Sequence, residues 1–236
     1  MNRGTSVGIR TMILALMLFV SVNLCASEAG AQAPTDKVTM RLDWKPGAQH
    51  APFYFAREKG YYAKEGIDLT LISGSGSSDA LKQVGSGSVT ISIVDAMVLA
   101  QGLEQKVPVK SVAVYFQNTP FTLMSPKAKP ITDVKQLTTG IKVGRRKASA
   151  TYQGLLALLS ANDIKPEQLN MVDIGFGVQP LLVRLIDVMI GSTITDPIEA
   201  EEAGMAVHEM LIHQHGVNVY GFTITVHNDL IAKSGR

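Results

Sequence analysis

Residues 67–103 read IDLTLISGSGSSDALKQVGSGSVTISIVDAMVLAQGL. Two apolar runs rich in β-branched residues, Ile67–Ile72 and Val89–Val94, predict strands. Each is followed by a stretch with the composition of a helix, and a Gly-Ser loop joins the first strand to its helix. A strand–helix–strand–helix order favours parallel strands covered by helices on both faces. The segment therefore predicts an α/β fold.

The same alternation extends along the chain in both directions. Further strands are expected at Val38–Asp43, Val109–Tyr115, Phe121–Met124, Ile141–Gly144, Met171–Ile174, Val188–Ile190 and Met210–His213. Further helices are expected at Ala51–Lys59, Thr151–Asn162, Pro180–Leu185 and Glu199–Gly204. The pattern restarts after Pro126, which predicts two α/β lobes with doubly wound parallel sheets. The first lobe is expected over residues 32–124 and the second over residues 125–218, with the chain crossing between them at residues 122–126.

The N-terminal stretch has the composition of a targeting segment. Arg3 and Arg10 flank the start of an apolar run, Thr11–Val22, and small residues follow it. This order predicts a secretory signal peptide over residues 1–31, cleaved after Ala31. The mature protein is then expected in the periplasm. Lipidation at Cys25 is not expected, because the residues before it are not the small ones that such a motif requires.

Composition excludes several classes of function. The chain has 22 basic and 20 acidic residues with no block of like charges, so no nucleic-acid partner is expected. A single cysteine excludes an intramolecular disulfide and a cysteine-rich zinc cluster. His208, His213 and His215 follow no zinc-motif spacing, so no metal is expected. The chain also lacks a nucleophile elbow and a phosphate-binding loop, so neither an enzyme nor a cofactor is predicted.

In α/β folds ligands bind at the loops that follow the strands, where helix N-termini present free N–H groups. The first such loop holds Trp44, the only tryptophan, and His50. An indole face and an imidazole could together hold a planar heterocycle. The alternative for Trp44 is packing at the end of the sheet, and for His50 capping of the next helix.

Four further candidates belong to the predicted first lobe. Ser75 and Gly76, in the Gly-Ser loop, could contact a polar edge of a ligand, or could form only a turn that caps a helix. Asp95 ends a predicted strand directly before a helix, which suits an N-cap as well as a cleft-facing acceptor. Tyr115 ends the fourth strand, with core packing as the alternative.

Two candidates belong to the second lobe. Ser149 follows the basic run Arg145-Arg146-Lys147 and precedes a helix. For Arg145 and Arg146 a solvated basic loop is the favoured interpretation. Asp196 stands before a proline at the start of a predicted helix.

Several of these residues also resemble those of a known family. The stretch Leu42-Asp43-Trp44-Lys45-Pro46, with His50, Gly60-Tyr61-Tyr62 and Glu65-Gly66-Ile67, resembles the opening of solute-binding proteins of ABC importers. It is most similar to the branch that binds thiamine pyrimidine precursors, with sulfonate, taurine and nitrate binders as relatives. The resemblance continues through Gly74–Ser77, Val94–Ala96, Val109–Gln117 and Ile194–Ala200. It implies a two-lobed periplasmic-binding-protein-like (type II) fold and the import of a small solute.

The resemblance also implies roles and partners. In the pyrimidine-binding branch a Trp and a His of the opening loop line the pocket, and they correspond to Trp44 and His50. Our hypothesis for the mechanism is that Trp44 stacks on the ligand, Asp95 and Asp196 accept hydrogen bonds from ring amino groups, and the Gly-Ser loop donates. Of the family's Gly-Ser loop in the second lobe, only Ser149 carries over. An ABC permease in the inner membrane would be the partner of a monomeric binding protein, and the two lobes would close on the solute. The alternatives are a sulfonate, taurine or nitrate binder, a pyrimidine-synthesising enzyme or a sensor module on the same fold.

The resemblance bears on the C-terminal end as well. In the family the chain returns to the first lobe and then adds helices, whereas this sequence ends at Arg236. The comparison implies that residues 219–236 form the return strand without the closing helices. It also implies that the first sheet keeps an apolar face uncovered.

Overall fold

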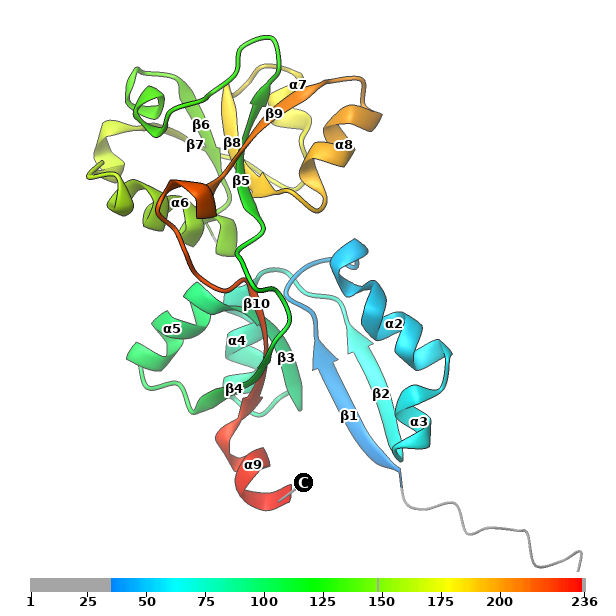
Figure 1. Cartoon of the computed structure of the whole chain (residues 1–236). Helices are drawn as coiled ribbons and strands as arrows, with labels where there is room; N and C mark the ends of the chain where they lie inside the picture. Colours follow the sequence, from blue (N-terminus) through cyan, green and yellow to red (C-terminus); the bar gives the residue numbers. More distant parts are fainter. Residues whose placement is uncertain (1–34, 148, 235–236) are drawn as a thin grey trace, which may run out of the picture. The chain divides into compact units, whose positions relative to one another are not determined.

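The computed structural model describes residues 35–147 and 149–234 (Figure 1). The predicted signal peptide and Cys25 lie outside the described residues. The chain from Lys37 onward forms one compact unit. Within the described ranges, no helix has both the length and the apolar character that a bilayer span requires.

In the described part of the chain, ten strands form two five-stranded sheets. The first sheet has the order β2-β1-β3-β10-β4 and the second the order β7-β6-β8-β5-β9. The strands are β1 Asp36–Arg41, β2 Ile67–Ile72, β3 Ile91–Asp95, β4 Val109–Val114, β5 Phe121–Pro126, β6 Lys142–Arg145, β7 Asn170–Asp173, β8 Val188–Ser192, β9 Val207–Leu211 and β10 Phe222–His227. The α/β fold class is therefore confirmed, and each sheet with its helices is called a lobe here.

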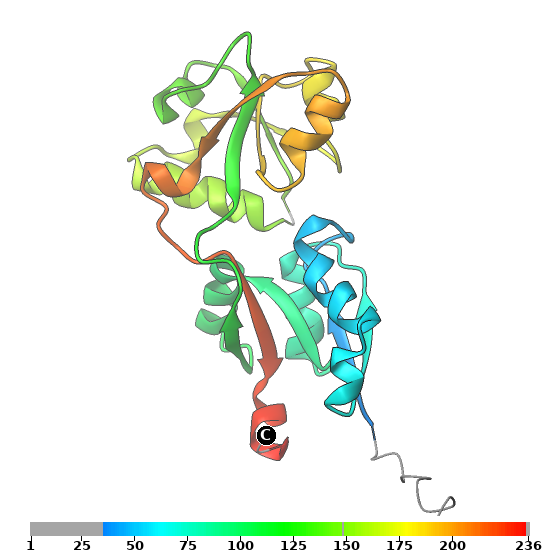
Figure 2. The same ribbon diagram turned by 45° about the vertical axis from the view of Figure 1, so that its right-hand side comes forward.

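Helices follow most of the strands and cover the sheets (Figures 1 and 2). The α-helices are α2 Ala51–Glu58, α3 Tyr61–Lys64, α4 Ser77–Gly85, α5 Ala96–Glu104, α6 Ala150–Ala161, α7 Gln179–Leu182, α8 Asp196–Glu202 and α9 Asn228–Ser234. Short 3-10 helices lie at Ala48–His50 (η2), Val134–Thr138 (η3), Pro166–Gln168 (η4) and Ile212–His215 (η5). Helix α6 forms because its apolar residues recur on one face, where Leu155, Leu158 and Leu159 are fully buried.

Each sheet combines the predicted parallel strands with antiparallel ones that the sequence did not indicate. Strand β1 runs parallel to β3, and β6 runs parallel to β7 and β8. In contrast, β10 is antiparallel to β3 and β4, and β5 is antiparallel to β8 and β9. The antiparallel strands are the ones that enter a sheet from the other lobe. They therefore begin at the edge where the parallel strands end.

The position of β5 also differs from the prediction. The strand expected at Phe121–Met124 as the last of the first lobe pairs instead with β8 and β9 of the second sheet. The chain therefore passes from the first sheet to the second before Phe121, not at residues 122–126. Hydrophobic alternation identified the strand but carried no information about its partners.

Two crossing segments, residues 115–121 and 216–222, run side by side between the lobes (Figures 1 and 2). The Thr119 N–H donates to the Val219 carbonyl over 3.0 Å, and the Gly221 N–H donates to the Phe116 carbonyl over 3.0 Å. Aromatic rings pack around them, with 5.4 Å between the ring centroids of Phe116 and Phe222. These contacts hold the two crossing segments together between the two sheets.

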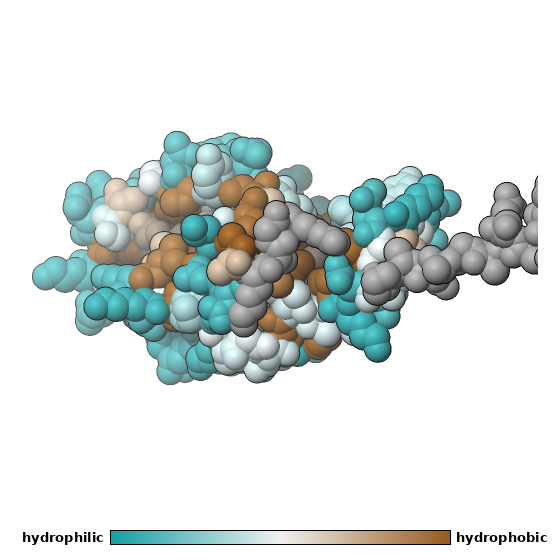
Figure 3. Space-filling model, turned by 90° about the horizontal axis from the view of Figure 1, so that it is seen from below, coloured by the Kyte–Doolittle hydropathy of each residue, from teal (hydrophilic) through white to brown (hydrophobic). Residues whose placement is uncertain are grey.

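Some large apolar side chains of the first lobe remain exposed. Seen from the end that carries α9, hydrophobic residues reach the surface between polar ones (Figure 3). Leu103 on α5, Val112 on the edge strand β4 and Ile231 on α9 are among these exposed residues. No hydrogen-bonded partner covers the outer edge of β4 within the described residues.

A close approach of two loops brings the Gly-Ser loop beside Trp44. The Gly74 N–H donates to the Trp44 carbonyl over 2.9 Å, and the Leu42 N–H donates to the Ile72 carbonyl over 2.9 Å. A Cβ atom at position 74 would collide with the Leu42 carbonyl oxygen. Only glycine therefore allows the loop after β2 to pack against the loop after β1.

We expect Gly74→Ala to lower the free energy of unfolding by about 2 kcal/mol or more, because the backbone of two loops must move apart. Urea denaturation followed by far-UV circular dichroism measures this change. Gly175→Ala is the matched control, since a Cβ there meets nothing within 4 Å. Equal losses in the two variants would contradict the packing argument.

Candidate functional site

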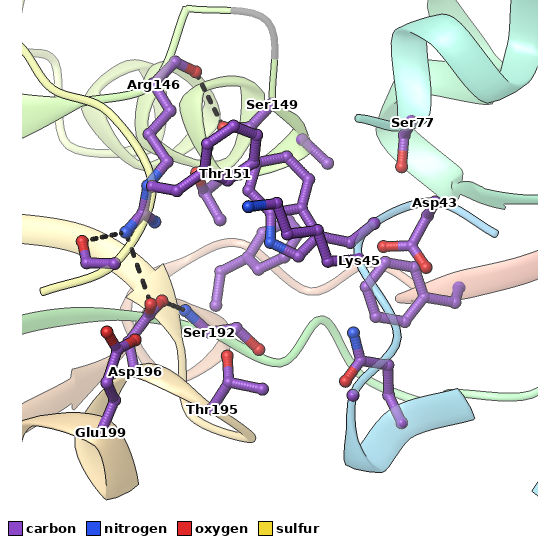
Figure 4. Close-up of a pocket in the computed structure, with 18 of the residues that line it drawn as sticks. Asp43, Lys45, Ser77, Arg146, Ser149, Thr151, Ser192, Thr195, Asp196 and Glu199 are labelled. Atoms are coloured by element: carbon purple, nitrogen blue, oxygen red, sulfur yellow. Dashed lines mark hydrogen bonds and ion pairs between the residues drawn. The ribbon is translucent and has the colours of Figure 1, made fainter. Parts of the chain in front are cut away.

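A cavity of about 420 Å³ lies between the two lobes (Figure 4). It is lined by the loops and helix starts that follow β1, β2, β6, β7 and β8 and by the first residues of β5 and β10. The lining residues are Asp43, Trp44, Lys45, Pro46, Gly47, Gln49, Ser77, Phe121, Arg146, Ser149, Ala150, Thr151, Phe176, Gly177, Ser192, Thr195, Asp196, Glu199 and Phe222. The carboxyl ends of the parallel strands thus meet at this cavity, as open α/β sheets predict.

Aromatic side chains from both lobes contact each other at the cavity. Trp44, from the loop after β1, lies with its ring centroid 4.8 Å from that of Phe176, from the loop after β7. The two ring planes are inclined by 51°. The Lys45 Nζ lies 4.1 Å from the centroid of the Phe176 ring, within the range of a cation–π interaction.

His50 lies behind the cavity wall and is fully buried. Its Nδ1 accepts a hydrogen bond from the Gly47 N–H over 3.2 Å, so Nε2 carries the proton and donates to Asp43 Oδ1 over 2.7 Å. Asp43 itself lines the cavity. His50 therefore orients a carboxylate, and it is Asp43 that a ligand would reach.

Asp95 caps the next helix. Its Oδ1 accepts from the Met97 N–H over 2.9 Å at the N-terminus of α5, and the residue is fully buried. Its Oδ2 has no partner among the described residues. Burial raises the pKa of this carboxyl to about 8, and the nearby charge of Asp43 adds to the shift. The structure thus shows the N-cap, and Asp95 does not line the cavity.

The Gly-Ser loop reaches the cavity through Ser77. The Ser77 Oγ accepts from the Asp95 N–H over 3.2 Å, which leaves its hydroxyl proton for a partner in the cavity. Gly76 has a φ of 141° and precedes α4, so it shapes the turn. Ser75 lines an adjoining hollow of about 240 Å³, together with Trp44 and Phe176.

Tyr115 lies among the aromatic residues of the crossing segments. Its ring centroid is 4.6 Å from that of Phe116, and its hydroxyl donates to the backbone carbonyl of Gln49. Burial raises the pKa of the Tyr115 phenol. The side chain of Gln49 lines the cavity, and its buried Oε1 has no hydrogen-bond partner within the described part of the chain.

Arg146 corrects the prediction of a solvated basic loop. Its side chain is buried at the cavity, where Nε donates to the Gly175 carbonyl over 3.0 Å. Nη2 donates to the Gly177 carbonyl over 2.9 Å and pairs with Asp196 over 3.4 Å (Figure 4). Arg145 lies within β6 and pairs with Asp173 outside the cavity over 2.9 Å. Arg145 is the last residue of β6 and Arg146 is the first residue of the loop after it, and the two neighbours have different partners.

The two second-lobe candidates, Ser149 and Asp196, both line the cavity. Asp196 Oδ2 accepts from the Ser192 N–H over 2.7 Å, so the carboxylate connects β8 to the start of α8 (Figure 4). The Ser149 hydroxyl donates to the Arg146 carbonyl over 2.8 Å and lies 2.7 Å from Thr151 Oγ1. Hydroxyl groups and a carboxylate therefore stand opposite Asp43.

Within residues 35–147 and 149–234, no three His, Cys, Asp or Glu side chains gather as metal ligands. Of the three histidines considered as metal ligands, His208 lies in β9, and His213 and His215 lie in η5.

A model of the family described as NMT1/THI5 like matches residues 47–236. The chain belongs to this family. Among curated relatives, 4-amino-5-hydroxymethyl-2-methylpyrimidine phosphate synthase THI5 of Saccharomyces cerevisiae is 29% identical over 176 residues, which cover 71% of this chain and 49% of the yeast protein. This NMT1/THI5-like chain thus spans about half the length of the yeast synthase it matches.

Two bacterial relatives are named as binding proteins. The riboflavin-binding protein RibY of Chloroflexus aurantiacus is 26% identical over 96% of this chain and 69% of the relative. The formylaminopyrimidine-binding protein of Halalkalibacterium halodurans is 25% identical over 78% of this chain and 55% of the relative.

Solved structures establish the fold of this NMT1/THI5-like protein. The periplasmic aliphatic sulphonate binding protein SsuA of Escherichia coli aligns with a TM-score of 0.64 at 14% identity, over 84% of this chain and 64% of SsuA. The alkanesulfonate-binding protein SsuA of Xanthomonas axonopodis pv. citri, bound to MOPS, gives 0.63 at 13% identity over 86% and 69%. The chain has the periplasmic-binding-protein fold.

The structure brings together half of the residues that sequence reasoning selected. Trp44, Ser149 and Asp196 line the main cavity and Ser75 the adjoining hollow, whereas the other four lie behind the walls; these are His50, Gly76, Asp95 and Tyr115. Sequence reasoning missed several lining residues of both lobes, among them Asp43, Lys45, Gln49, Arg146, Phe176 and Glu199. Asp43 and Lys45 flank Trp44 in the sequence and Gln49 lies in the same loop, so their proximity to Trp44 was the available signal. Phe176 lies between two glycines in a loop that follows a predicted strand, and that position was likewise a signal for a ligand contact.

We expect His50→Ala to lower the free energy of unfolding by about 2–4 kcal/mol, because it leaves the Asp43 carboxylate buried without its donor. Thermal and urea unfolding measure the loss. His215→Ala is the control, because His215 lies in η5 and is not among the residues that line the cavity. A His50 variant as stable as this control would show that the pair does not stabilise the loop.

The raised pKa of Asp95 predicts how stability depends on pH. From about pH 4, the value of an unfolded Asp, up to about pH 8, the folded chain keeps a proton that the unfolded chain releases. This group therefore makes the protein less stable as the pH rises through that window. Asp95→Asn keeps an oxygen for the N-cap but does not titrate.

Urea unfolding of wild type and Asp95→Asn between pH 4 and pH 8 measures this effect. The stability of the variant relative to wild type should increase steadily over that range. Asp133→Asn, at the exposed N-cap of η3, is the matched control. Parallel pH curves for wild type and Asp95→Asn would refute the assignment.

Proposed function

We propose that this protein is the extracytoplasmic substrate-binding component of an ABC import system. Its cavity is proposed to bind a small heteroaromatic solute similar to a thiamine pyrimidine precursor. The observation that carries the proposal is the interlobe cavity itself, in which an aromatic face and hydrogen-bonding side chains from both lobes converge. A ligand that contacts both lobes favours the closed arrangement, since only that arrangement makes both sets of contacts.

The size and lining of the cavity support a planar nitrogen heterocycle. A volume of about 420 Å³ lies within the range of small-molecule sites. Trp44 offers a face for stacking. Asp43, Gln49 and Asp196 offer oxygen acceptors for ring amino groups, and Ser77 and Ser149 offer hydroxyls. Asp43 takes the role that sequence reasoning had assigned to Asp95.

The names of two relatives agree with this ligand class. RibY is named for riboflavin, and the Halalkalibacterium halodurans relative is named for formylaminopyrimidine. Both ligands contain planar nitrogen heterocycles. In this proposal the predicted signal peptide directs the chain to the periplasm, and a membrane permease is the partner that receives the solute from a monomeric binding protein.

A sulfonate, taurine or nitrate binder is the second candidate, because Arg146 lines the cavity and structures of sulfonate-binding proteins share the fold. The charges at the cavity favour the first candidate. Arg146 is already engaged by Asp196 and two carbonyl oxygens. The three carboxylates of Asp43, Asp196 and Glu199 outnumber the two cations that line the cavity, Lys45 and Arg146, so the balance of charge disfavours an anion.

Isothermal titration calorimetry on the purified chain tests the choice. The panel consists of 4-amino-5-hydroxymethyl-2-methylpyrimidine, formylaminopyrimidine, riboflavin, taurine and nitrate. Binding of a heterocycle without binding of taurine or nitrate supports the proposal. Binding of taurine or nitrate alone would replace the ligand class, and catalytic turnover of any heterocycle would favour the enzyme named among the relatives.

We expect Trp44→Leu to weaken the binding of a heterocycle about tenfold, because the variant removes the stacking face and keeps an apolar side chain. Calorimetry measures the dissociation constant. Phe55→Leu is the matched control, because Phe55 is an exposed aromatic residue on α2 away from the cavity lining. An unchanged affinity in Trp44→Leu would refute the stacking role.

A further inference from the structure

We propose that Phe176 determines the specificity of this site. Together with Trp44 it forms an aromatic clamp that spans the two lobes and accepts a planar heteroaromatic ring between its two faces. This inference rests on the proposed function and extends it, because it assigns a ligand-recognition role to a second-lobe residue.

The contact between the two rings is the first observation. Their centroids lie 4.8 Å apart, and the ring planes are inclined by 51°. Trp44 follows β1 of the first sheet and Phe176 follows β7 of the second. Both line the main cavity and the adjoining hollow. The pair is therefore a contact between the lobes at the place where the two hollows meet.

The exposure of Phe176 is the second observation. Its side chain is 51% exposed although it lies at a cavity, whereas aromatic side chains of the crossing segments such as Phe121 are 2% exposed. The core does not need the Phe176 ring for packing. It lies between Gly175 and Gly177, whose carbonyl oxygens accept hydrogen bonds from Arg146. Arg146 thus holds the backbone on both sides of Phe176 while the ring projects toward Trp44.

Lys45 adds a charge to the same pair. Its Nζ lies 4.1 Å from the centroid of Phe176, although it belongs to the loop of the other lobe. The Lys45 side chain extends into the cavity (Figure 4). A cation over the ring strengthens the contact by an electrostatic attraction that salt screens. One loop of the first lobe therefore contacts Phe176 with both an indole and an ammonium group.

The distance between the Trp44 and Phe176 rings determines how far they must move apart to admit a ligand ring. Aromatic carbons pack at about 3.5 Å, so a planar ring between two parallel faces requires about 7 Å between those faces. The present 4.8 Å leaves no room for it. Entry of a ring must separate Trp44 from Phe176 by about 2 Å, and the two original faces then contact the ligand. The lobes thus exchange one aromatic contact for two.

This exchange selects for the shape of the ligand. A planar heterocycle regains the stacking that it displaces, on both of its faces. A tetrahedral sulfonate offers no flat face and would separate the rings without compensation. The clamp therefore discriminates between the two ligand classes by geometry, in addition to the charges of the lining carboxylates.

The first experiment uses the purified chain without added ligand. Because Trp44 is the only tryptophan, its fluorescence reports on this contact alone. We expect Phe176→Leu to red-shift the emission and to increase quenching by acrylamide, because the indole loses its cover. Phe176→Tyr should retain the wild-type emission, and Phe55→Leu is the matched control for loss of an exposed phenylalanine. Wild-type emission and quenching in Phe176→Leu would overturn the clamp.

The second experiment measures affinity for the planar pyrimidines, riboflavin and taurine by calorimetry. We expect Phe176→Leu to weaken the best planar ligand about three- to tenfold, with Phe176→Tyr near wild type, as loss and retention of an aromatic pair predict. Lys45→Gln should give a smaller loss that disappears in high salt.

Equal affinity of wild type and Phe176→Leu for a planar ligand would overturn the clamp and leave the proposed function intact. Binding of taurine alone by the wild-type chain would overturn both proposals. Phe176 is half exposed, so its variants are expected to fold, and their far-UV circular dichroism verifies this.

Discussion

The site depends on the way the chain crosses between its lobes. Two segments, residues 115–121 and 216–222, are hydrogen-bonded to each other and packed by aromatic rings. Because β5 and β10 begin at this crossing, they run opposite to the parallel strands that end there. The ends of the parallel strands, with their loops and helix N-termini, therefore converge on one cavity.

Within this frame, buried polar contacts orient the side chains that line the cavity. In the first lobe His50 holds Asp43, and Gly74 lets the Gly-Ser loop pack against the Trp44 loop. In the second lobe Arg146 connects the loop after β7 to Asp196. Each lobe thus presents a pre-oriented wall, which lowers the entropy that binding must overcome. The walls contact each other through Trp44 and Phe176, so in the proposed function ligand recognition and lobe closure involve the same side chains.

Particular residues show where sequence reasoning succeeded and where it failed. The loop at residues 43–50 was selected because it follows a strand and holds Trp44 and His50, and residues of this loop line the cavity. His50 was a plausible ligand contact in the sequence, yet the fold buries it behind Asp43. Arg146 looked like half of a solvated basic pair, and only the tertiary structure shows that it pairs with Asp196 at the cavity while Arg145 pairs with Asp173 outside it. Local sequence carries chemical type, but not the direction in which a side chain points.

The sequence by itself determined the α/β class, the order of the elements, the loops that carry the site and the family resemblance. These properties arise from hydrophobic periodicity and from short motifs, which are local. Only the tertiary structure decided which sheet receives β5, which residues face the cavity, and that Phe176 contacts Trp44 across 132 positions of sequence. Such pairings result from long-range packing. Many strand registers are compatible with the same local pattern, and the burial of the whole core selects one of these registers.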